Sequence, residues 1–519
     1  MTSSNKFSPP PVLAYAICIV IGLLAGKNLY QGSTKGNKIL DIFNKVDDYY
    51  VDDVDINKLE EHTITSMLNY LDPHSYYLNA EIMRSEQEQM QGNFDGIGVQ
   101  FKIIEDTICV LKAIKNGPSM KAGIQAGDRL IAVNKEVFVG DSITNELAMQ
   151  RLKGPKGSSV ELTLLRNRKT LDFLIERGTI PLKSVPVASM IDNETGYIKI
   201  NRFASKTYEE FMEGANRLAQ QNMQKLVLDL RGNPGGLMHS VVAICEEFLQ
   251  KGQLIVYTKG RSDKEEERAQ KTGVFSKLPV VILIDENSAS ASEILAGALQ
   301  DHDRGTIIGR RSFGKGLVQR PFNLRDGSAL RLTISRYYTP VGRCIQKDYG
   351  KNNDEYFSES YKRFENGELS TMDSIPIADS LKFTTPKGKK VYGGGGIIPD
   401  YFIPLDTSIY NSVYQQITLS NTLTRYYLLH VAQWKSRLQP LSVKAAYEQL
   451  RGSKIPQEFK EFVQTQLHLD INSTAYKNAS KQLHQILFAQ FLESSFEEEG
   501  YYLPLLEKDA AVQAAIKIH

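Results

Sequence analysis

Two short stretches of the 519-residue chain carry side chains that could perform covalent chemistry. In the first, Ser288, Ser290 and Ser292 alternate with alanines where the apolar run Val280–Ile284, typical of a buried strand, gives way to apolar residues at helical spacing. A hydroxyl at a strand-to-helix turn lies near the positive end of the helix dipole, which suits a nucleophile whose attack generates negative charge. In the second, Lys315 lies between two glycines, where close backbone packing can desolvate it. A buried lysine loses its proton more easily and can act as a general base toward a serine.

Each stretch also has an interpretation without catalysis. Ser290 and Glu293 match the capping box, in which a serine only satisfies the backbone at the start of a helix. The segment GRRSFGKG nearly matches a phosphate-binding loop, but Gly316 takes the place of the hydroxyl residue that would bind magnesium, and strand-like residues follow. A Ser-His-Asp triad would require His302, which lies between two aspartates and is typical of a solvated helix cap. We therefore expect neither nucleotide binding nor a triad, and capping stays the alternative for the serine.

The motifs SASASE, FGKG and the following LVQ, with the earlier DLRGNPGG, resemble those of the carboxy-terminal processing peptidases, the tail-specific serine proteases of peptidase family S41. The motifs occur in the family's order, and the resemblance extends from about Ile39 to Asp406. It implies that Ser290 is the nucleophile, that Lys315 is the base, and that Gln319 orients the lysine. Asp301 matches an acidic position with a supporting role. Because a carboxylate paired with the lysine would keep it protonated, we expect Asp301 to be structural.

The stretch VLDLRGNPGG, residues 227–236, is typical of a strand, a tight turn and the start of a helix. Consecutive glycines before a helix present free backbone N–H groups, as an oxyanion hole requires, although an ordinary α/β turn has the same pattern. The family resemblance implies that Gly235 or Gly236 shares this role with the N–H group of Ala291. The sequence does not distinguish between the two glycines.

Residues 93–177 change to short strands around a brief helix that a proline opens and a glycine closes. This region resembles a PDZ domain. The resemblance implies that a peptide is added to it as an extra strand and that backbone N–H groups capture the terminal carboxylate of the peptide. The segment Gly96, Ile97, Gly98 and Val99 would supply these N–H groups and the pairing edge, because glycines let the backbone close on a carboxylate without obstruction.

The order of elements predicts an α/β multidomain protein. Strands and helices alternate from about Ser184, which indicates an α/β core, and the resemblance implies a crotonase/ClpP-like protease fold of mixed sheets and helices with the PDZ-like β-domain inserted. The polar, charged insert at 347–390 is expected to be a mobile excursion. The expected division is a membrane segment at 1–30, a helical region at 31–92, the PDZ-like domain at 93–177, the protease core at 178–406 and a helical domain at 407–519.

Charge, cysteine spacing and the N-terminal apolar run limit the possible partners, metal sites and cellular location. The 62 basic and 60 acidic residues leave a net charge of +2, which gives no reason to expect nucleic acid as a partner. The four cysteines lack paired or metal-type spacing, so we expect neither a disulfide framework nor a metal site. Residues Pro11–Gly26 are apolar and uncharged, with a lysine on either side, which is typical of a signal anchor in the membrane rather than of a core helix. We expect an envelope protein whose bulk is periplasmic or otherwise extracytoplasmic, anchored to the inner membrane.

The sequence therefore predicts a serine endopeptidase with a Ser-Lys dyad and without a cofactor, which degrades or processes proteins from unfolded or flexible C-terminal ends. A peptide bound to the PDZ-like module is expected to activate it. The helical stretch from Ile39 to Gln91 is either a cap on the core or a dimerisation arm, and the resemblance favours a homodimer. The alternative is a proteolytically inactive PDZ scaffold, which the fold alone would permit. The intact Ser290, Lys315 and Gln319 argue against it, and the PDZ-like module argues against a third hypothesis, an acyl-transfer or hydratase-like enzyme.

Overall fold

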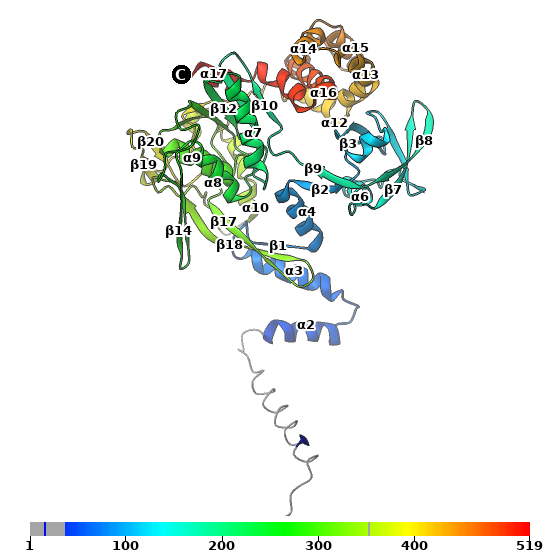
Figure 1. Cartoon of the computed structure of the whole chain (residues 1–519). Coiled ribbons are helices and arrows are strands. Elements are labelled where there is room, and N and C mark those ends of the chain that lie inside the picture. Colours follow the sequence, from blue (N-terminus) through cyan, green and yellow to red (C-terminus); the bar gives the residue numbers. More distant parts are fainter. Residues whose placement is uncertain (1–14, 17–36, 351–352, 519) are drawn as a thin grey trace, which may run out of the picture. The chain divides into compact units, whose positions relative to one another are not determined.

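The computed structural model describes residues 15–16, 37–350 and 353–518 (Figure 1). The chain forms two compact units, Met1–Leu71 and Asp72–His519, which are described separately. The predicted membrane anchor at Pro11–Gly26 lies outside the described residues, apart from Tyr15 and Ala16. Among the helices that are described, none has both the length and the apolar character needed to cross a membrane.

The described part of the first unit consists of two helices, α2 (Asn37–Tyr49) and α3 (Ile56–Asn69). Asp55 begins α3, because its carboxylate accepts the N–H of Lys58 at 3.2 Å. The helices confirm the helical character predicted for this region. Large apolar side chains stay exposed on both: Ile39, Leu40, Ile42, Tyr49 and Met67.

A β-domain occupies the first part of the second unit. Its sheet has the strand order β3-β4-β5-β7-β8, with β6 paired to β5, so β3 forms one edge. The strands β2 and β9 pair with each other, which places the entry and the exit of the domain side by side. The bounds are β2 Asn93–Gly96, β3 Val99–Ile104, β4 Thr107–Ala113, α5 Pro118–Ala122, β5 Arg129–Val133, β6 Glu136–Val137, α6 Asn145–Leu152, β7 Ser159–Arg166, β8 Lys169–Glu176 and β9 Gly178–Pro181.

A six-stranded sheet with the order β10-β11-β12-β15-β16-β21 forms the centre of the second unit, and all its strands except β10 run parallel. Alternate residues of β12 face opposite sides: Leu226 and Leu228 pack towards α7, α8 and α9, while Val227 packs towards α17 (Ala510–Lys517). Covering both faces explains the unbroken apolar run of β15, whose five residues are all buried. The bounds are β10 Val187–Met190, β11 Thr195–Lys199, α7 Thr207–Gln220, β12 Lys225–Asp229, α8 Met238–Glu246, β15 Val280–Ile284, α9 Ala291–Asp301, β16 Gly305–Gly309 and β21 Tyr401–Phe402.

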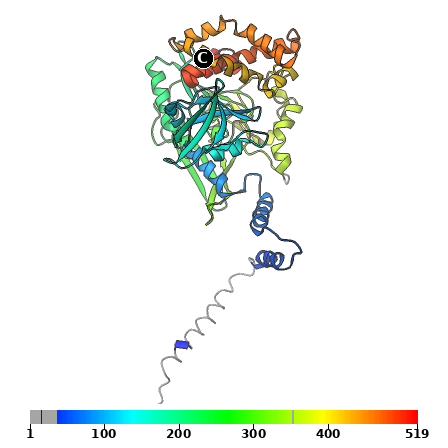
Figure 2. The ribbon, with the colours of Figure 1, turned by 90° about the vertical axis from the view of Figure 1, so that its right-hand side faces the viewer.

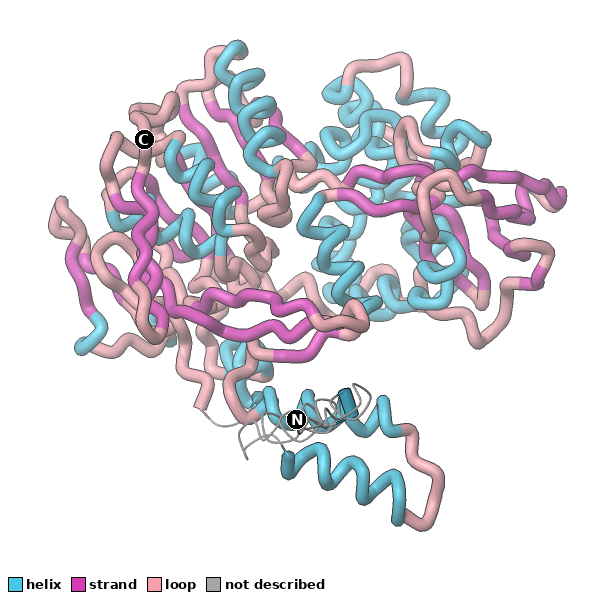
Figure 3. Tube along the Cα trace, turned by 60° about the horizontal axis from the view of Figure 1, so that its bottom comes forward, coloured by secondary structure: helices cyan, strands magenta, loops and turns pink. Residues whose placement is uncertain are grey.

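A second, antiparallel sheet has the order β1-β18-β13-β14, with β17 also paired to β18. Figure 3 shows β17 and β18 as a long two-stranded ribbon. Because β1 pairs with β18, a segment that precedes the β-domain in sequence lies beside strands that follow it by more than a hundred residues. The bounds are β1 Tyr76–Leu78, α4 Ala80–Gln91, β13 Leu254–Gly260, β14 Lys264–Arg268, β17 Leu317–Asn323 and β18 Ala329–Tyr338.

The insert at 347–390 contains α10 (Asn353–Phe357), α11 (Glu359–Glu365) and β19 (Lys382–Thr384). It ends where β20 (Lys390–Tyr392) begins. The prediction of an excursion from the core is wrong for its first half, because Tyr356, Arg363 and Glu368 are buried. The charged residues that suggest a solvated loop instead form ion pairs with buried arginines: Arg311 with Glu368, and Arg363 with Glu359. Composition alone cannot distinguish these two uses of charge.

The C-terminal helices of the second unit, orange and red in Figure 2, gather around their own core of aromatic and aliphatic side chains. Trp434 and Phe491 lie in that core with ring centroids 6.1 Å apart. Lys112 of the β-domain forms ion pairs with Glu493 at 3.3 Å and Glu497 at 2.9 Å, which joins the β-domain to these helices. The bounds are α12 Ser412–Leu419, α13 Thr422–Leu438, α14 Val443–Arg451, α15 Ile455–Leu467, α16 Thr474–Glu507 and α17 Ala510–Lys517.

Candidate active site

The candidate nucleophile Ser290 lies at the turn between β15 and α9, as the sequence predicts. Its backbone has φ +56° and ψ −113°, a conformation that side-chain-bearing residues rarely adopt and that costs about 1–3 kcal/mol. The turn is held in place by the N–H of Ala289, which donates to the carbonyl oxygen of Asn233 at 3.0 Å. Strain of this kind persists only where surrounding contacts impose it. The strained turn places Ser290 beyond the C-terminal end of β15.

The structure distinguishes Ser290 from its two neighbouring serines. The Ser288 hydroxyl donates to the carbonyl oxygen of Leu230 at 2.9 Å, and the Ser292 hydroxyl donates to that of Asn233 at 3.0 Å. Both side chains are fully buried. Ser290 alone among the three is partly exposed, so it is the one that a substrate can reach.

Glu293 connects the serine turn to the lysine loop. Its buried carboxylate accepts the N–H of Ser290 at 2.8 Å, which forms the predicted capping box. The same carboxylate accepts the N–H groups of Gly314 at 2.7 Å and Lys315 at 2.9 Å, and the hydroxyl of Ser312 at 2.5 Å. Burial raises the pKa of Glu293, while these hydrogen bonds act against that rise. Capping and catalysis are therefore compatible uses of this motif.

Tyr337 of β18 makes a second connection between the two segments. Its buried hydroxyl lies 3.0 Å from the carbonyl oxygen of Ser290 and 2.7 Å from that of Lys315. A hydroxyl has one hydrogen, so it donates to one carbonyl at a time, yet both must lie beside it. The backbones of the two candidate catalytic residues are thus brought to one point. No local pattern in the sequence indicates this role for a tyrosine so far along the chain.

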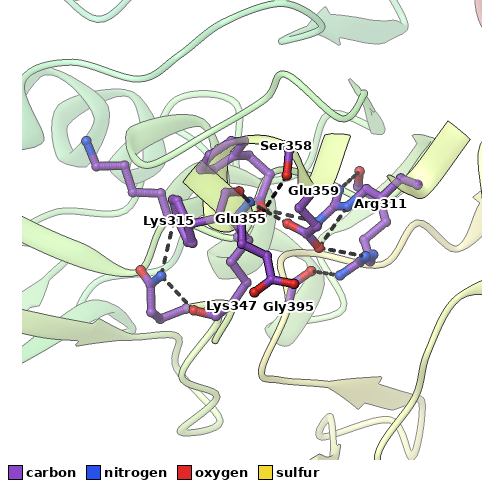
Figure 4. A network of polar contacts seen from close by, with 12 residues as sticks. Arg311, Lys315, Lys347, Glu355, Ser358, Glu359 and Gly395 are labelled. Carbon is purple, nitrogen blue, oxygen red and sulfur yellow. Dashed lines mark hydrogen bonds and ion pairs between the residues drawn. The ribbon is translucent and has the colours of Figure 1, made fainter. Parts of the chain in front are cut away.

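The surroundings of Lys315 favour the neutral form of its amine. Burial lowers its pKa to about 8, and the Arg331 guanidinium acts in the same direction. The carboxylates of Glu293, Glu86 and Asp72 partly offset this effect. Within the described residues, the ammonium group has no hydrogen bond or ion pair of its own. Figure 4 shows its side chain directed away from the neighbouring network of charged residues.

This environment predicts the pH dependence of catalysis. If neutral Lys315 is the base, kcat/KM should rise with pH through a midpoint near 8, because the protonated amine below that pH cannot accept a proton. Below the midpoint the rate should fall by about tenfold per pH unit. The measurement is cleavage of a fluorogenic peptide from acidic to alkaline pH, with melting temperature followed in parallel. A profile that is flat across this range in a folded enzyme would contradict the assignment.

Gln319 lies on β17, and its side chain contacts Thr333 of β18 rather than the lysine. The Gln319 Nε2 to Thr333 Oγ1 distance is 3.5 Å, and the threonine hydroxyl in turn donates to Asp72 at 3.0 Å. No hydrogen bond joins Gln319 to Lys315 within the described part of the chain. Its role in orienting the lysine stays a prediction.

Gly235 and Gly236 both have positive φ angles, +102° and +143°. A methyl group on Gly235 would lie 2.7 Å from the Ser290 Cβ and 3.0 Å from the Ala291 nitrogen, so this position tolerates only glycine. The Gly235 N–H donates to the side-chain oxygen of Asn233 at 2.9 Å. The N–H groups of Gly236 and Ala291 have no acceptor among the described residues. Of the two glycines that the sequence left open, Gly236 is therefore the one with an available donor.

Asp301 and His302, at the end of α9, are engaged elsewhere. Asp301 forms a fully buried ion pair with Arg343 at 2.5 Å, which agrees with a structural role. The two ring nitrogens of His302 lie 2.7 Å from the carbonyl oxygen of Leu254 and 3.2 Å from the side-chain amide of Gln253. Because both ring nitrogens are occupied by β13 and the residue before it, this histidine is not available as the base of a triad.

The candidate peptide-binding segment precedes and begins the edge strand of the β-domain. Gly98 has φ +74°, and Val99 starts β3, whose outer edge has no strand partner in the described sheet. Gly96 forms an isolated antiparallel bridge with Lys153, and Ile97 is buried. An open edge that follows a glycine turn can pair with an added strand, as the sequence predicts.

Comparison with known proteins gives concordant matches. The model described as peptidase family S41 matches residues 194–356, and the PDZ domain model matches residues 96–176. A carboxy-terminal-processing protease of Bartonella bacilliformis is 38% identical over 314 residues, covering 59% of this chain and 71% of the relative. The carboxy-terminal processing protease CtpB of Bacillus subtilis is 34% identical over 326 residues, covering 61% of this chain and 68% of the relative. Among solved structures, the photosystem II D1 C-terminal processing protease is 27% identical, covers 61% of this chain and 91% of its own, and has a TM-score of 0.36.

Proposed function

Since this chain belongs to the carboxy-terminal processing serine proteases of peptidase family S41, we propose that it cleaves proteins engaged at their flexible C-terminal ends, with Ser290 as nucleophile and Lys315 as base. Membership confirms the family, the PDZ domain, the mixed α/β fold class and the serine-protease activity that the sequence predicts. The observation that supports the Ser-Lys assignment is the shared anchoring of both residues by Glu293 and Tyr337.

The proposed reaction follows from the groups at the site. Neutral Lys315 takes the proton of the Ser290 hydroxyl as the oxygen attacks the scissile carbonyl carbon. The N–H groups of Gly236 and Ala291 hold the resulting oxyanion. The tetrahedral intermediate collapses to an acyl-enzyme as the protonated lysine gives its proton to the leaving amine. Water, deprotonated by the same lysine, then hydrolyses the ester and releases Ser290.

The proposed recognition of C-termini uses the open edge of β3. An unfolded chain end would add a strand there, with its carboxylate at the N–H groups of Gly96 to Val99. Occupation of the PDZ domain would also activate the protease. The pairing of β2 with β9 supports such coupling, because both ends of the domain enter the protease part together.

A matched pair of substrates tests the proposed function. An unfolded protein with an apolar C-terminus should be cleaved faster than the same protein with a C-terminal amide, because the amide removes the charge that the backbone N–H groups would bind. Cleavage is followed by mass spectrometry, with Ser290→Ala as the blank. Equal rates would contradict recognition of the C-terminus. If a short C-terminal peptide added in trans fails to accelerate cleavage of an unrelated reporter peptide, activation by the PDZ domain is wrong.

We also propose that the chain acts outside the cytoplasm, held at the inner membrane by Pro11–Gly26, and that it forms a homodimer. The support for self-association is the apolar surface that α2 and α3 leave exposed in the first unit, including Ile39, Leu40 and Met67. Sedimentation of the protein with and without residues 37–71 tests this proposal. A monomer at all concentrations for the intact protein would contradict it.

A further inference from the structure

The loop that carries Lys315 is held by charged residues of the insert. Residues 310–316 form neither helix nor strand, so their position depends on a few single backbone hydrogen bonds, such as that from the Phe313 N–H to the carbonyl oxygen of Ser288 at 3.0 Å, and on side-chain contacts. Beside them lies a cluster that we call the clamp, part of which is drawn in Figure 4. In the clamp, Arg311 pairs with Glu368 at 2.6 Å, Arg363 pairs with Glu359 at 3.2 Å, and Lys347 also pairs with Glu359. The clamp therefore consists of Arg311, Lys347, Glu359, Arg363 and Glu368.

Arg363 of α11 binds the loop backbone directly. Its guanidinium donates to the carbonyl oxygen of Ser312 at 2.9 Å and to that of Phe313 at 3.2 Å. Its side chain is only 3% exposed, so these carbonyls have a charged donor where water cannot replace it. Planar guanidinium groups suit this use, because one side chain presents several donors in a fixed arrangement. Two consecutive peptide units before the catalytic lysine are fixed in this way.

Neighbouring residues hold the rest of the loop. The Lys347 ammonium lies 4.2 Å from the centre of the Phe313 ring, and its backbone N–H donates to the carbonyl oxygen of Gly314 at 2.9 Å. The Gln346 side-chain oxygen accepts the N–H of Gly316 at 2.8 Å. The loop is thus bound before Lys315 by Lys347 and Arg363 of the insert, and after Lys315 by Gln346, the residue that precedes the insert.

We propose that the insert positions the catalytic lysine, with Arg363 as the positioning residue that acts through the carbonyls of Ser312 and Phe313. This inference rests on the proposed function of Lys315 and assigns a role to a segment that carries no catalytic motif. In the clamped loop, the lysine side chain is directed away from the charged residues, and the clamp holds the loop backbone that carries it (Figure 4). Loosening the loop would misplace the amine and admit water to it.

Arg363→Lys tests the proposal with the charge retained. A lysine at this position can still pair with Glu359, but its compact ammonium cannot bind both carbonyls in the same geometry. We expect kcat to fall by about tenfold to a hundredfold with little change in KM, since a shift of about 1 Å at a reacting group has effects of this size. The midpoint of the pH–rate profile should move upwards from about 8, because a better-hydrated Lys315 has a more ordinary pKa.

A shift of the pH–rate midpoint would report on the position of Lys315, because Arg363→Lys leaves the other charged groups around Lys315 unchanged. If Arg363 had a purely structural role, Arg363→Lys would lower the melting temperature. The pH–rate profile of the variant that remains folded would then keep its midpoint. The matched control is Lys362→Ala on the same helix, whose exposed side chain pairs with Glu355; it should leave kcat and the pH midpoint unchanged. The unchanged groups that face Lys315 are Arg331, Glu293, Glu86, Asp72 and His74.

A second variant covers the case in which Arg363→Lys does not fold. Glu359→Gln removes the charge that anchors Arg363 at the rim of the clamp, where Glu359 is 28% exposed, and should lower kcat in the same direction but by less. A folded variant of either kind with wild-type kcat and pH midpoint would overturn the positioning role. Lys315→Met separates the two claims: if it is inactive while the clamp variants are normal, only the inference fails, whereas an active Lys315→Met overturns the proposed function as well.

Discussion

Ser290→Ala is expected to abolish peptide cleavage, with kcat reduced by about 10⁴-fold or more, the size of effect seen when a serine nucleophile is removed. No neighbouring hydroxyl can substitute, because those of Ser288 and Ser292 are buried and donate to main-chain carbonyls. The variant should fold, since alanine keeps the backbone N–H that donates to the Glu293 carboxylate at 2.8 Å. Initial rates of peptide cleavage, with melting curves recorded on the same samples, provide the measurement.

Ser288→Ala is the matched control for that experiment. It removes a hydroxyl two residues away, and it should lower stability by about 1 kcal/mol through the lost hydrogen bond to Leu230 while most activity remains. If Ser290→Ala stayed active, or if a folded Ser288→Ala were equally inactive, the choice of the middle serine would be wrong.

Lys315→Met should lower kcat by about 10²- to 10⁴-fold, the usual contribution of a general base. Methionine retains much of the apolar stem but has no amine to accept the Ser290 proton. Because the Lys315 ammonium is desolvated and has no partner among the described residues, replacing it by an apolar group should leave the melting temperature equal or higher. Loss of activity together with unchanged or greater stability would be the signature of a residue kept for chemistry.

Lys315→Arg distinguishes proton transfer from simple positive charge. A guanidinium stays protonated at any pH that the protein tolerates, so this variant should also be inactive and should show no recovery at alkaline pH. Substantial activity in Lys315→Arg would mean that the site needs a cation rather than a base, and the proposed mechanism would be wrong.

The sequence was most informative where a function depends on local pattern. The serine turn follows from an apolar strand and helical spacing next to it, and the structure places Ser290 between β15 and α9. The alternation of strands and helices likewise predicts the α/β core, whose central sheet the structure shows. A local pattern also bears on the choice between Gly235 and Gly236. In a common turn, an asparagine side chain accepts the backbone N–H two residues further on, and Asn233 accepts the N–H of Gly235 in this way.

Residues that act through tertiary contacts could not be predicted. The sequence predicts a capping box at Glu293, but the bonds of this residue to Gly314 and Lys315 exist only because the fold returns the loop to the helix N-terminus. Arg363 belongs to a charged insert whose composition is typical of a solvated excursion. Whether such charges face water or each other is decided by a partner distant in sequence, which no local pattern contains.

The most direct test of the account is to identify the residue that becomes covalently modified by a fluorophosphonate, which transfers its phosphonyl group to an activated serine hydroxyl with loss of fluoride. Peptide mapping by mass spectrometry should find one adduct, on Ser290, which forms faster as pH rises through about 8 and is strongly reduced in Lys315→Met. An adduct on Ser288, Ser292 or a distant serine, or equal labelling of Ser290 in Lys315→Met, would contradict a serine activated by this lysine.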